Sequence, residues 1–492
     1  MRSAYDTTTI YAAEAALMAT VPNGALMALA SHGLADVIRD LLEPAGLRGR
    51  RVVILCGSGN NGGDALYAGA ILCRRGLAVD AVTVSDRWHQ GGAEALVAAG
   101  GRLVGADDAL ATSVVGAADV VVDGIVGIGA QGPVRPPATD LLASIPPQAW
   151  VVAVDIPSGV DPTTGAVPDP SAAVKADVTV TFGAYKAGQF LPPGRDRCGI
   201  LQLVDIGLSP ALVGRDPALR VLDLADVAAV FAAPGEDDYK YSHGVLGVLA
   251  GCAQYPGAPH MVVGAARHAG VGMVRLWSDP AAPEVAAAVV TRFPDTVCTL
   301  TVPDDRATAW TVGPGLGVTD ERAQLLSGLL ASDAPLVVDA DALTLVASSQ
   351  DLRDALRQRS APTAITPHVG EFARLGFEAG DDRVAAAQGA ADDLDVIVVL
   401  KGPGTVIAAP GAVPFVDVMG TAALATAGTG DALSGLVGAA LARRPEDPVR
   451  AVAAAVALHG LAGRVASRGD QPMTAWDLVA AVRPAVAEAR TG

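Results

Sequence analysis

The chain has 492 residues, of which 51% are hydrophobic and only 4% aromatic, and 52 acidic against 35 basic side chains give a formal net charge of −17. An acidic chain with few aromatic rings lacks the cationic surface and the stacking platforms of a nucleic-acid-binding protein. The 56 glycines and 33 prolines have no periodic spacing, which excludes collagen, and the length leaves room for two to four domains of about 100–200 residues.

The cysteines and the N-terminus bear on the cellular compartment. The five cysteines are far apart and include no CxxC pair, which predicts a reducing compartment without a zinc or disulfide framework. The first ten residues have no apolar core, so we expect no signal peptide. The longest uncharged stretch, 241–266, contains glycines and prolines that would break a spanning helix, and it predicts a strand and a loop. We therefore expect a cytoplasmic protein without a membrane segment.

Short apolar runs alternate with helix-like segments through the first half of the chain. A helix is predicted at 64–75, and strands are predicted at 51–56, 79–84, 120–123, 150–155, 178–182 and 199–205. This alternation predicts a parallel α/β sheet whose ligands bind at the carboxyl ends of its strands.

A glycine-rich loop follows the first of these strands. Gly57, Gly59 and Gly62 match the pattern G-x-G-x-x-G, in which glycines allow a tight turn and the next helix offers free N–H groups to a phosphate. This pattern alone is a weak signal. The loop also carries polar side chains that the dinucleotide-binding pattern does not require, namely Asn60, Asn61 and Asp64. A turn residue and a helix cap are the alternative interpretation of the two asparagines.

Polar side chains also follow two later strands. Asp123 precedes a second glycine loop at 127–133, and Asp155 is followed by Ser158. The carboxyl ends of parallel strands share one edge of a sheet, so these side chains can converge with Asn61 on one pocket. Amide, hydroxyl and carboxylate oxygens are hard ligands, which suit a cation. Taken singly, each aspartate could instead be a helix cap or a surface group.

The motifs GNNGGD, DGIVGIG, VDIPSGVD and FGAYKAGQFLPPGR follow one another between residues 59 and 195. Together they resemble the epimerase domain of bacterial bifunctional NAD(P)H-hydrate repair enzymes. The resemblance implies that Asp155 is the acid/base residue, and that potassium is bound by Asn61, Asp123 and Ser158. It also implies that the hydrated dinucleotide, chiefly its phosphate region, is held by Asp155 and by residues of both glycine loops, namely Asn60, Asn61, Gly62, Gly63, Asp64, Gly127, Ile128, Gly129, Ala130, Gln131, Gly132 and Pro133.

Two positions of this half have no assigned role. The family usually has glycine where Ala65 stands, and whether the loop must shift depends on whether this residue already lies in the helix. Lys186, in the last motif, is one of only four lysines in the chain, and its retention is a weak sign that a compact ammonium group is needed there.

The alternation loosens between residues 208 and 235, where glycines and prolines surround a short helical piece at 222–231. We therefore predict a first domain at 1–213, a linker with a short helix at 214–234 and a second α/β domain at 235–492. In the second domain, helices are predicted at 431–441 and 449–467, and strands at 245–250, 273–277, 309–312, 335–339, 363–366, 396–400 and 405–408.

The sharpest motif of the second half is AGTGD, in which Gly428, Thr429 and Gly430 precede Asp431 at the start of a helix. The N–H groups of a helix N-terminus form an anion hole, and an aspartate beside it can take a proton from a substrate hydroxyl during phosphoryl transfer. Upstream, KGPGT lies between two predicted strands and can place Lys401 along the phosphates of a nucleotide. No Walker A sequence is present. A turn with a capping aspartate is the alternative interpretation of GTGD alone.

With VGPGLG at 312–317, LVVDADAL at 336–343 and TPHVGEF at 366–372, these motifs resemble the ADP-dependent NAD(P)H-hydrate dehydratase domain, which has a ribokinase-like fold. The resemblance implies that the hydrated nicotinamide nucleotide contacts Ala258, Gly315, His368 and Asp431. It implies a site for ADP, with Mg²⁺, that is formed by Lys401, Gly402, Pro403, Gly404, Thr405, Gly428, Thr429 and Gly430. Thr344 departs from the family's usual asparagine, and Glu371 and Lys240 have no assigned role.

The sequence therefore predicts a Rossmann-like three-layer αβα domain followed by a ribokinase-like α/β domain. The resemblance implies a homo-oligomeric metabolite-repair enzyme that interconverts R and S NAD(P)H-hydrate and dehydrates the S epimer, with ADP converted to AMP and phosphate. Two alternatives stay open: a ribokinase-like alcohol kinase with an accessory dinucleotide-binding module, and a first domain that serves only as a dinucleotide-binding or protein-interaction module. The sequence does not distinguish NADH hydrate from NADPH hydrate.

Overall fold

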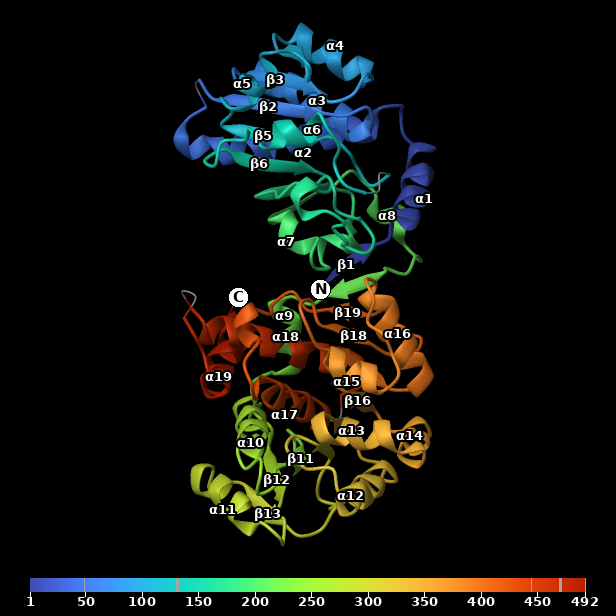
Figure 1. The fold of residues 1–492 in the computed structure, drawn as a ribbon, viewed down its shortest axis with the longest axis vertical. Helices are drawn as coiled ribbons and strands as arrows, with labels where there is room; N and C mark the ends of the chain where they lie inside the picture. Colours follow the sequence, from blue (N-terminus) through green and yellow to red (C-terminus); the bar gives the residue numbers. More distant parts are fainter. Residues whose placement is uncertain (48, 130–131, 444, 469–470, 492) are drawn as a thin grey trace. The chain divides into compact units, whose positions relative to one another are not determined.

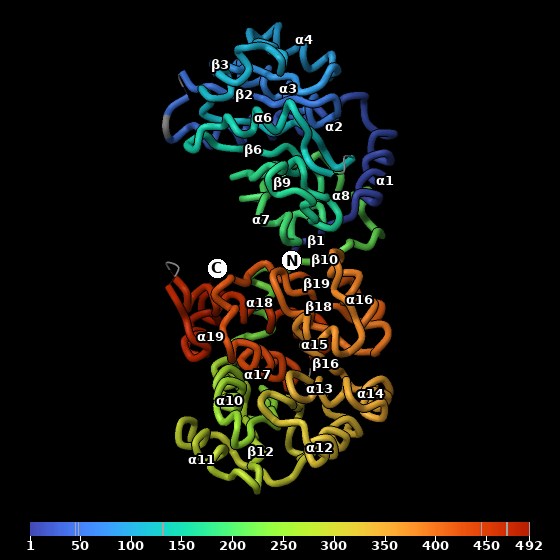
Figure 2. The backbone as a smooth tube through the Cα atoms, in the orientation of Figure 1, coloured from blue at the N-terminus to red at the C-terminus, as the bar shows by residue number. Residues whose placement is uncertain are grey.

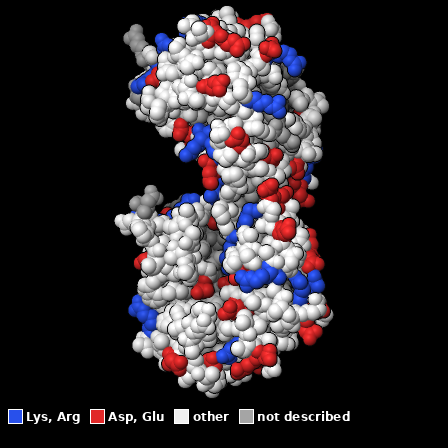
Figure 3. Space-filling view, in the orientation of Figure 1, with Lys and Arg blue, Asp and Glu red and all other residues white. Residues whose placement is uncertain are grey.

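The computed structural model describes residues 1–47, 49–129, 132–443, 445–468 and 471–491. The chain divides into two compact units, Ser3–Ala218 and Leu219–Gly492, the second of which also includes Met1–Arg2. Figure 1 shows the elements of each unit, and Figure 2 traces the backbone through them. On the face drawn in Figure 3, Lys and Arg side chains are interspersed with Asp and Glu on each unit.

The first unit is built on a seven-stranded sheet with strand order β4-β3-β2-β5-β6-β7-β9, in which all neighbours are parallel. Its strands are β2 (Arg51–Cys56), β3 (Ala78–Thr83), β4 (Arg102–Gly105), β5 (Val120–Gly124), β6 (Trp150–Val154), β7 (Val178–Phe182) and β9 (Ile200–Val204). Strands β1 (Arg2–Tyr5) and β8 (Tyr185–Lys186) form a short parallel pair that is not part of this seven-stranded sheet. Its helices are α1 (Thr7–Met18), α2 (Ala25–Leu42), α3 (Asn60–Arg74), α4 (Gln90–Ala98), α5 (Ala111–Val115), α6 (Ala138–Leu142), α7 (Arg195–Cys198) and α8 (Ser209–Leu212).

The apolar strands of this sheet are buried on both faces. Val52 and Ile54 of β2 pack in a core with α2, α3 and α4, whereas Val53 and Leu55 pack in a second core with α5 and α6. Successive side chains of a strand point to opposite faces, so a strand between two helical layers needs a continuous apolar run. The run RVVILC therefore forms the middle layer of a three-layer unit.

The second unit is built on a mostly parallel sheet with strand order β13-β12-β11-β14-β15-β16-β17-β18-β19-β10. The antiparallel neighbours within it are the pairs β17–β18 and β18–β19. The strands are β10 (Leu219–Val221), β11 (Val245–Leu249), β12 (Met273–Trp277), β13 (Val297–Thr299), β14 (Ala309–Val312), β15 (Leu336–Val338), β16 (Thr363–Ile365), β17 (Ile397–Leu400), β18 (Val406–Ala408) and β19 (Phe415–Val416).

Helices cover both faces of this second sheet. One layer contains α10 (Ala258–His268), α17 (Thr429–Ala442), α18 (Pro448–Ala466) and α19 (Ala475–Thr491), with α9 (Leu224–Val230) against its end. The remaining helices are α11 (Pro283–Arg292), α12 (Asp320–Leu330), α13 (Ala340–Ser348), α14 (Gln350–Arg357), α15 (Val369–Arg374) and α16 (Arg383–Leu394). In Figure 1, α17 and α18 lie against one another and α13 to α16 lie apart from them.

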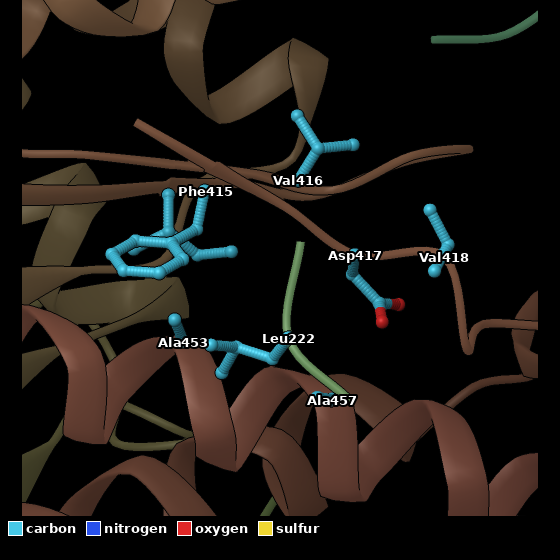
Figure 4. A pocket seen from close by; sticks show the side chains of 8 residues that line it. Leu222, Phe415, Val416, Asp417, Val418, Ala453 and Ala457 are labelled. Carbon is cyan, nitrogen blue, oxygen red and sulfur yellow. The ribbon is translucent and has the colours of Figure 1, made fainter. Parts of the chain in front are cut away.

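By length and composition alone, helix α18 could cross a membrane, but 72% of its apolar 18-residue segment is buried inside the protein. It packs against α17 and α19, and its small side chains belong to the core of the second unit. Figure 4 shows a cavity of about 10 Å³ between α18 and the strand that contains Phe415 and Val416. A space of this size holds at most one water molecule, so it is a packing gap rather than a ligand site.

Two segments differ from their predicted structures. The stretch 241–266 contains a strand and also the start of α10 at Ala258. Pro259 lies in the first turn of this helix, where backbone N–H groups have no partner within the helix, so proline loses no hydrogen bond there. Within 214–234, where we expected a linker and a short helix, β10 pairs with β19 at Arg220 and α9 packs Val227 and Phe231 into the core of the second unit.

Candidate active sites of the two units

The glycine loop of the first unit leads directly from β2 into α3. Helix α3 begins at Asn60, four residues earlier than predicted, with Gly59 as its N-cap. At Gly62 a Cβ would lie 2.4 Å from the carbonyl oxygen of Gly57, so this close approach of two backbones requires glycine. Ala65 lies inside the helix and is buried, so the absence of glycine there requires no unusual backbone conformation.

A cavity of about 1050 Å³ opens where β2, β5 and β6 end. The predicted substrate residues that line it are Asn60, Asn61, Asp64, Gly127, Ile128, Gly129 and Asp155. Gly62 and Gly63 do not line it, since they face the Gly57 backbone and the His89 ring. Gly132 and Pro133 are exposed and also lie outside the lining, and the predicted residues Ala130 and Gln131 lie outside the described residues. The cavity is large enough for part of a dinucleotide.

Asn61, Asp123 and Ser158, the predicted potassium ligands, meet beside the backbone of Val126. Ser158 Oγ donates to Asp123 Oδ1 at 2.6 Å, Ser158 N donates to Asp123 Oδ2 at 2.8 Å, and Val126 N donates to Ser158 Oγ at 3.1 Å. Asn61 Nδ2 donates to the carbonyl oxygen of Val154 at 2.7 Å and lies 3.4 Å from that of Val126. Asp123 and Ser158 bring carboxylate and hydroxyl oxygens together, and the amide oxygen of Asn61 lies close to Gly127. Oxygens of these three kinds are the ligands that a hard cation prefers.

Asp123 is fully buried, and this burial raises the pKa of its carboxyl to about 6, although bonds from Ser158 and Ile125 lower it. A cation among these oxygens would compensate the buried charge. Within the described ranges, no group of three or more His, Cys, Asp or Glu side chains is arranged to hold a metal ion. The oxygen donors of Asn61 and Ser158 are therefore essential to any cation site here.

Asp155 is held by contacts from a distant part of the chain. Its carboxylate pairs with the ammonium group of Lys186, which is only 1% exposed, and accepts from Thr181 Oγ1 at 3.2 Å. Gln189 Nε2 donates to the backbone oxygen of Asp155 at 2.8 Å. The residue has a φ of 69°, a left-handed conformation that a non-glycine residue adopts only when its surroundings impose it. The network therefore orients Asp155 into the cavity and gives Lys186 a defined role.

Helix α1 supplies cavity residues that sequence reasoning missed. Tyr11 and Glu14 line the cavity, and a Cβ on Gly129 would lie 2.7 Å from the Tyr11 hydroxyl. Burial raises the pKa of Glu14, and the charge of Asp155 raises it further while that of Lys186 lowers it. Nothing in the local sequence of α1 marks these residues, because the helix is identified with the cavity only by its position in the fold. By contrast, Asp80 lies inside β3 and pairs with Arg102.

In the second unit, the AGTGD motif forms the start of α17. Gly428 has a φ of 88° and is the N-cap of the helix, which leaves Thr429, Gly430 and Asp431 in the first turn. Nε2 of the buried His459 donates to the carbonyl oxygen of Thr429 at 2.9 Å, because a carbonyl oxygen can only accept. Burial lowers the pKa of His459 to about 4, so the imidazole is neutral. Thr429 N donates to the carbonyl oxygen of Thr426 at 3.3 Å, and the other N–H groups of the first turn of α17 are presented from a fixed position.

Lys401 connects this turn with two carboxylates on other elements. Its Nζ lies 2.9 Å from Asp339 Oδ1 and 3.6 Å from Glu371 Oε2, and a Cβ on Gly430 would lie 3.6 Å from it. Burial lowers the pKa of Lys401, but Asp339 and Glu371 raise it by more, so the ammonium group stays charged. Lys401 is therefore a buried cation at the mouth of the helix N-terminus. Glu371 and Asp339, which sequence analysis left without roles, are its partners.

Asp431 has the protonation equilibrium expected of a base that works near neutral pH. Burial raises the pKa of its carboxyl to about 7, with further contributions from Asp339, Asp341 and Glu371, while Lys401 lowers it. A general base is most effective when its pKa lies near the working pH. The turn can therefore accept a proton at Asp431 and stabilise an anion at its N–H groups.

The other residues predicted to contact substrate surround this turn. Gly315 has a φ of 57°, and a Cβ there would lie 2.9 Å from that of Ala258, so these two residues are in contact. His368 is the N-cap of α15: its Nδ1 accepts from Gly370 N at 2.9 Å, and its own N–H donates to Glu371 Oε2 at 2.8 Å. Its exposed ring is therefore tied through Glu371 to Lys401.

The nucleotide-binding loop predicted at 401–405 connects β17 and β18. Gly402 and Gly404 have φ of 149° and 61°, and Arg383 Nη2 donates to the carbonyl oxygens of Leu400 and Lys401. The remaining departure, Thr344, lies in α13 and accepts from Arg374 Nη1 at 2.8 Å. It joins α13 to α15.

Comparison with known proteins identifies relatives along the whole chain. A family model described as NAD(P)H-hydrate dehydratase matches residues 246–483, and one described as YjeF-related protein N-terminus matches residues 23–188. The bifunctional NAD(P)H-hydrate repair enzyme Nnr of Mycobacterium tuberculosis is 46% identical over 448 residues, 90% of this chain and 89% of the relative. That of Mycobacterium leprae is 43% identical over 99% of this chain and 100% of the relative.

A solved structure extends the likeness to the fold of the second unit. The ribokinase-like superfamily protein of Enterococcus faecalis is 25% identical, with a TM-score of 0.51, and covers 56% of this chain and 98% of its own. The predicted ribokinase-like fold is therefore confirmed, and the three-layer α/β architecture of the first unit agrees with the prediction for that half.

Proposed function

The chain belongs to the family of bifunctional NAD(P)H-hydrate repair enzymes, and from this membership we infer that it is both an epimerase and a dehydratase of hydrated NADH and NADPH. The dehydratase depends on an adenine nucleotide. Family membership favours this function over an alcohol kinase and over a first unit that serves only as a binding or interaction module.

We assign epimerisation to the first domain, residues 1–213, and dehydration to the second, residues 235–492. The family model for the dehydratase lies within the second range, and that for the N-terminal part lies within the first. Each range also contains its own group of buried acidic residues paired with a buried lysine. The two activities therefore need separate sites, since each group is assembled from residues of one unit.

In the epimerase, ring-nitrogen electrons expel the hydroxyl group, and water adds to either face of the cationic ring. We propose that Asp155 moves the proton in this exchange, because it faces the cavity while Lys186 holds it in position. Asn60 to Asp64 and Gly127 to Pro133 would hold the dinucleotide. Asn61, Asp123 and Ser158 would bind K⁺, which supplies fixed positive charge near the phosphates. Removal of K⁺ should reduce epimerisation and leave dehydration unchanged.

In the dehydratase, we propose that Asp431 takes the proton of the substrate hydroxyl. The N–H groups of Gly428, Thr429 and Gly430 and the ammonium group of Lys401 would stabilise the transferred phosphoryl group. Loss of phosphate then restores the ring double bond, with ADP converted to AMP and phosphate. Ala258, Gly315 and His368 would contact the hydrated nucleotide. Magnesium, when bound with the nucleotide, neutralises phosphate charge, and carboxylates such as Asp339 and Asp341 are suitable ligands. The position of Asp431 in this turn, beside Lys401, is the observation that carries the proposal.

The experiment is recovery of reduced-nicotinamide absorbance from a mixture of R and S NADPH hydrate with Mg²⁺ and K⁺, with and without ADP. Recovery of the whole mixture only with ADP, faster than spontaneous epimerisation, supports both activities. Recovery that stops at the S fraction contradicts the epimerase assignment, and no recovery with ADP or ATP contradicts the dehydratase assignment. We further propose a homo-oligomeric cytoplasmic enzyme, which light scattering and fractionation would test.

A further inference from the structure

Asp64 is a buried carboxyl of the epimerase cavity, and one of its oxygens has no hydrogen-bond donor among the described residues. It lies in the second turn of α3, lines the cavity and is only 7% exposed. Among the described residues, no donor reaches its buried Oδ1. A buried carboxylate without hydrogen-bond donors is strongly unfavourable, whereas a buried carboxylic acid is not.

Two other roles for Asp64 fit the structure poorly. A helix-capping aspartate accepts a backbone N–H in the first turn, and the described part of the chain contains no such bond to Asp64. A direct contact with the phosphates of the dinucleotide, which the motif resemblance implies for the whole segment, would bring a carboxylate against an anion. A protonated carboxyl avoids both difficulties because it is neutral and can donate.

We propose that Asp64 is a second catalytic carboxyl of the epimerase, which donates a proton to the departing hydroxyl group while Asp155 accepts a proton from the water that adds. This inference rests on the proposed epimerase function and adds a proton donor to it. It also gives separate roles to Asp64 and Asp155, two of the three carboxyls that line the cavity with Glu14. Asp155 is paired with the ammonium of Lys186, and Asp64 has no cationic partner among the described residues.

The surroundings of Asp64 all favour its neutral form. Burial raises the pKa of its carboxyl well above the usual value, and the charges of Asp155 and Glu14 raise it further. The titratable side chains around it are Tyr11 and Glu14 of α1, Tyr67 of α3, His89 before α4, Asp155 after β6, and Lys186 behind Asp155. Pairs of carboxyls whose environments separate their proton affinities commonly divide the roles of acid and base.

The chemistry balances without a further reactant. The C–O bond of the hydrate breaks, the ring-nitrogen electrons form a C=N bond, and the Asp64 proton leaves with the hydroxyl oxygen as water. A water molecule then forms the new C–O bond on either face and loses one proton to Asp155. One proton has moved from Asp64 to Asp155, and exchange with cavity water restores both. In the reverse reaction, the two residues exchange roles.

The first test compares Asp64→Asn with wild type in the full-length protein at saturating K⁺. We expect kcat for epimerisation to fall about 10²–10⁴-fold with KM within about threefold, since general-acid catalysis contributes about this much. The dehydratase of the same chain, assayed on pure S hydrate, should be unchanged and serves as an internal control. Asp40→Asn, an exposed carboxyl on α2, is the matched surface control and should leave both activities unchanged.

The two hypotheses fail in different ways. If wild type does not epimerise, the proposed function is wrong and the role of Asp64 falls with it. If wild type epimerises and Asp64→Asn retains kcat within about threefold, the epimerase stands and our inference is overturned. A raised KM with unchanged kcat also overturns it, because that result indicates a binding role.

A second measurement does not depend on the folding of the variant. Infrared spectra of wild type with ¹³C-labelled aspartate, recorded at pH 8.5, should contain the carbonyl band of a protonated aspartic acid. Asp123 and Asp431, with pKa values of about 6 and about 7, are ionised at that pH and do not contribute. The band should be absent from Asp64→Asn. A wild-type spectrum without it overturns the proposal.

Discussion

Replacing Lys401 with methionine tests whether the buried charge network of the second unit is held together by this one ammonium group. Methionine keeps much of the apolar stem and removes the charge. The Lys401 side chain is 19% exposed, and its partners Asp339 and Glu371 are 2% and 8% exposed. The substitution therefore leaves two buried carboxylates without their cation.

The expected loss of stability follows from this burial. Removal of one partner of a buried ion pair destabilises a protein by about 3–5 kcal/mol, mainly because the remaining charge stays buried. In the variant, Ser434 Oγ still donates to Asp339 at 2.5 Å and His368 N still donates to Glu371. These bonds keep the expected loss of stability from exceeding about 3–5 kcal/mol. The loss should be largest at high pH, because the stranded carboxylates take up protons as the pH falls.

The assay is urea unfolding at about pH 8 and pH 5, followed by hydrogen exchange and mass spectrometry on peptides from β15 and α17, which report the second unit alone. Lys240→Met is the matched control: its side chain is exposed over the Tyr241 ring, and we expect a change within about 1 kcal/mol. A loss below about 1 kcal/mol for Lys401→Met, or an equal loss at both pH values, would refute the reasoning.

Asp431, His459 and Gly315 give three further expected outcomes. With a pKa of about 7, Asp431 should make dehydratase kcat/KM rise between about pH 6 and 8, and a flat profile contradicts its role as base. Burial lowers the pKa of His459 to about 4, so the free energy of unfolding should fall as the pH drops from about 6.5 toward 4; acid denaturation of His459→Gln should show a smaller loss. Gly315→Ala should raise KM for the hydrate and leave epimerisation unchanged, because its Cβ would press on Tyr255 and Ala258.

Local patterns were sufficient for apolar strands of both sheets. The apolar runs predicted at 51–56 and 273–277 are β2 and β12 at the same bounds. The family matches confirm the function that the motif resemblance implied. These features can be read from the sequence because they depend on strand periodicity and on short motifs, in which neighbouring residues determine the backbone.

The errors lie where local signals are ambiguous. The sequence predicts a helix from residue 64, yet α3 begins at Asn60, and the close approach of Gly62 to the Gly57 backbone lies in its first turn. The stretch 241–266 is predicted as a strand and a loop, yet α10 begins within it at Ala258, with Pro259 in its first turn. Glycine and proline disfavour the middle of a helix but are tolerated in its first turn, and only tertiary contacts decide between these outcomes.

Apolar runs and short motifs are enough to predict the two α/β architectures, the positions of most strands along the chain and the motifs at their carboxyl ends. Only the tertiary structure decided which charged side chains meet. Lys186 is 31 residues from Asp155, Lys401 is 62 residues from Asp339, and Glu14 reaches the cavity from a helix with no motif. Such contacts depend on how distant segments pack and close, which no local periodicity encodes, and they are what set the proton affinities of the candidate catalytic residues.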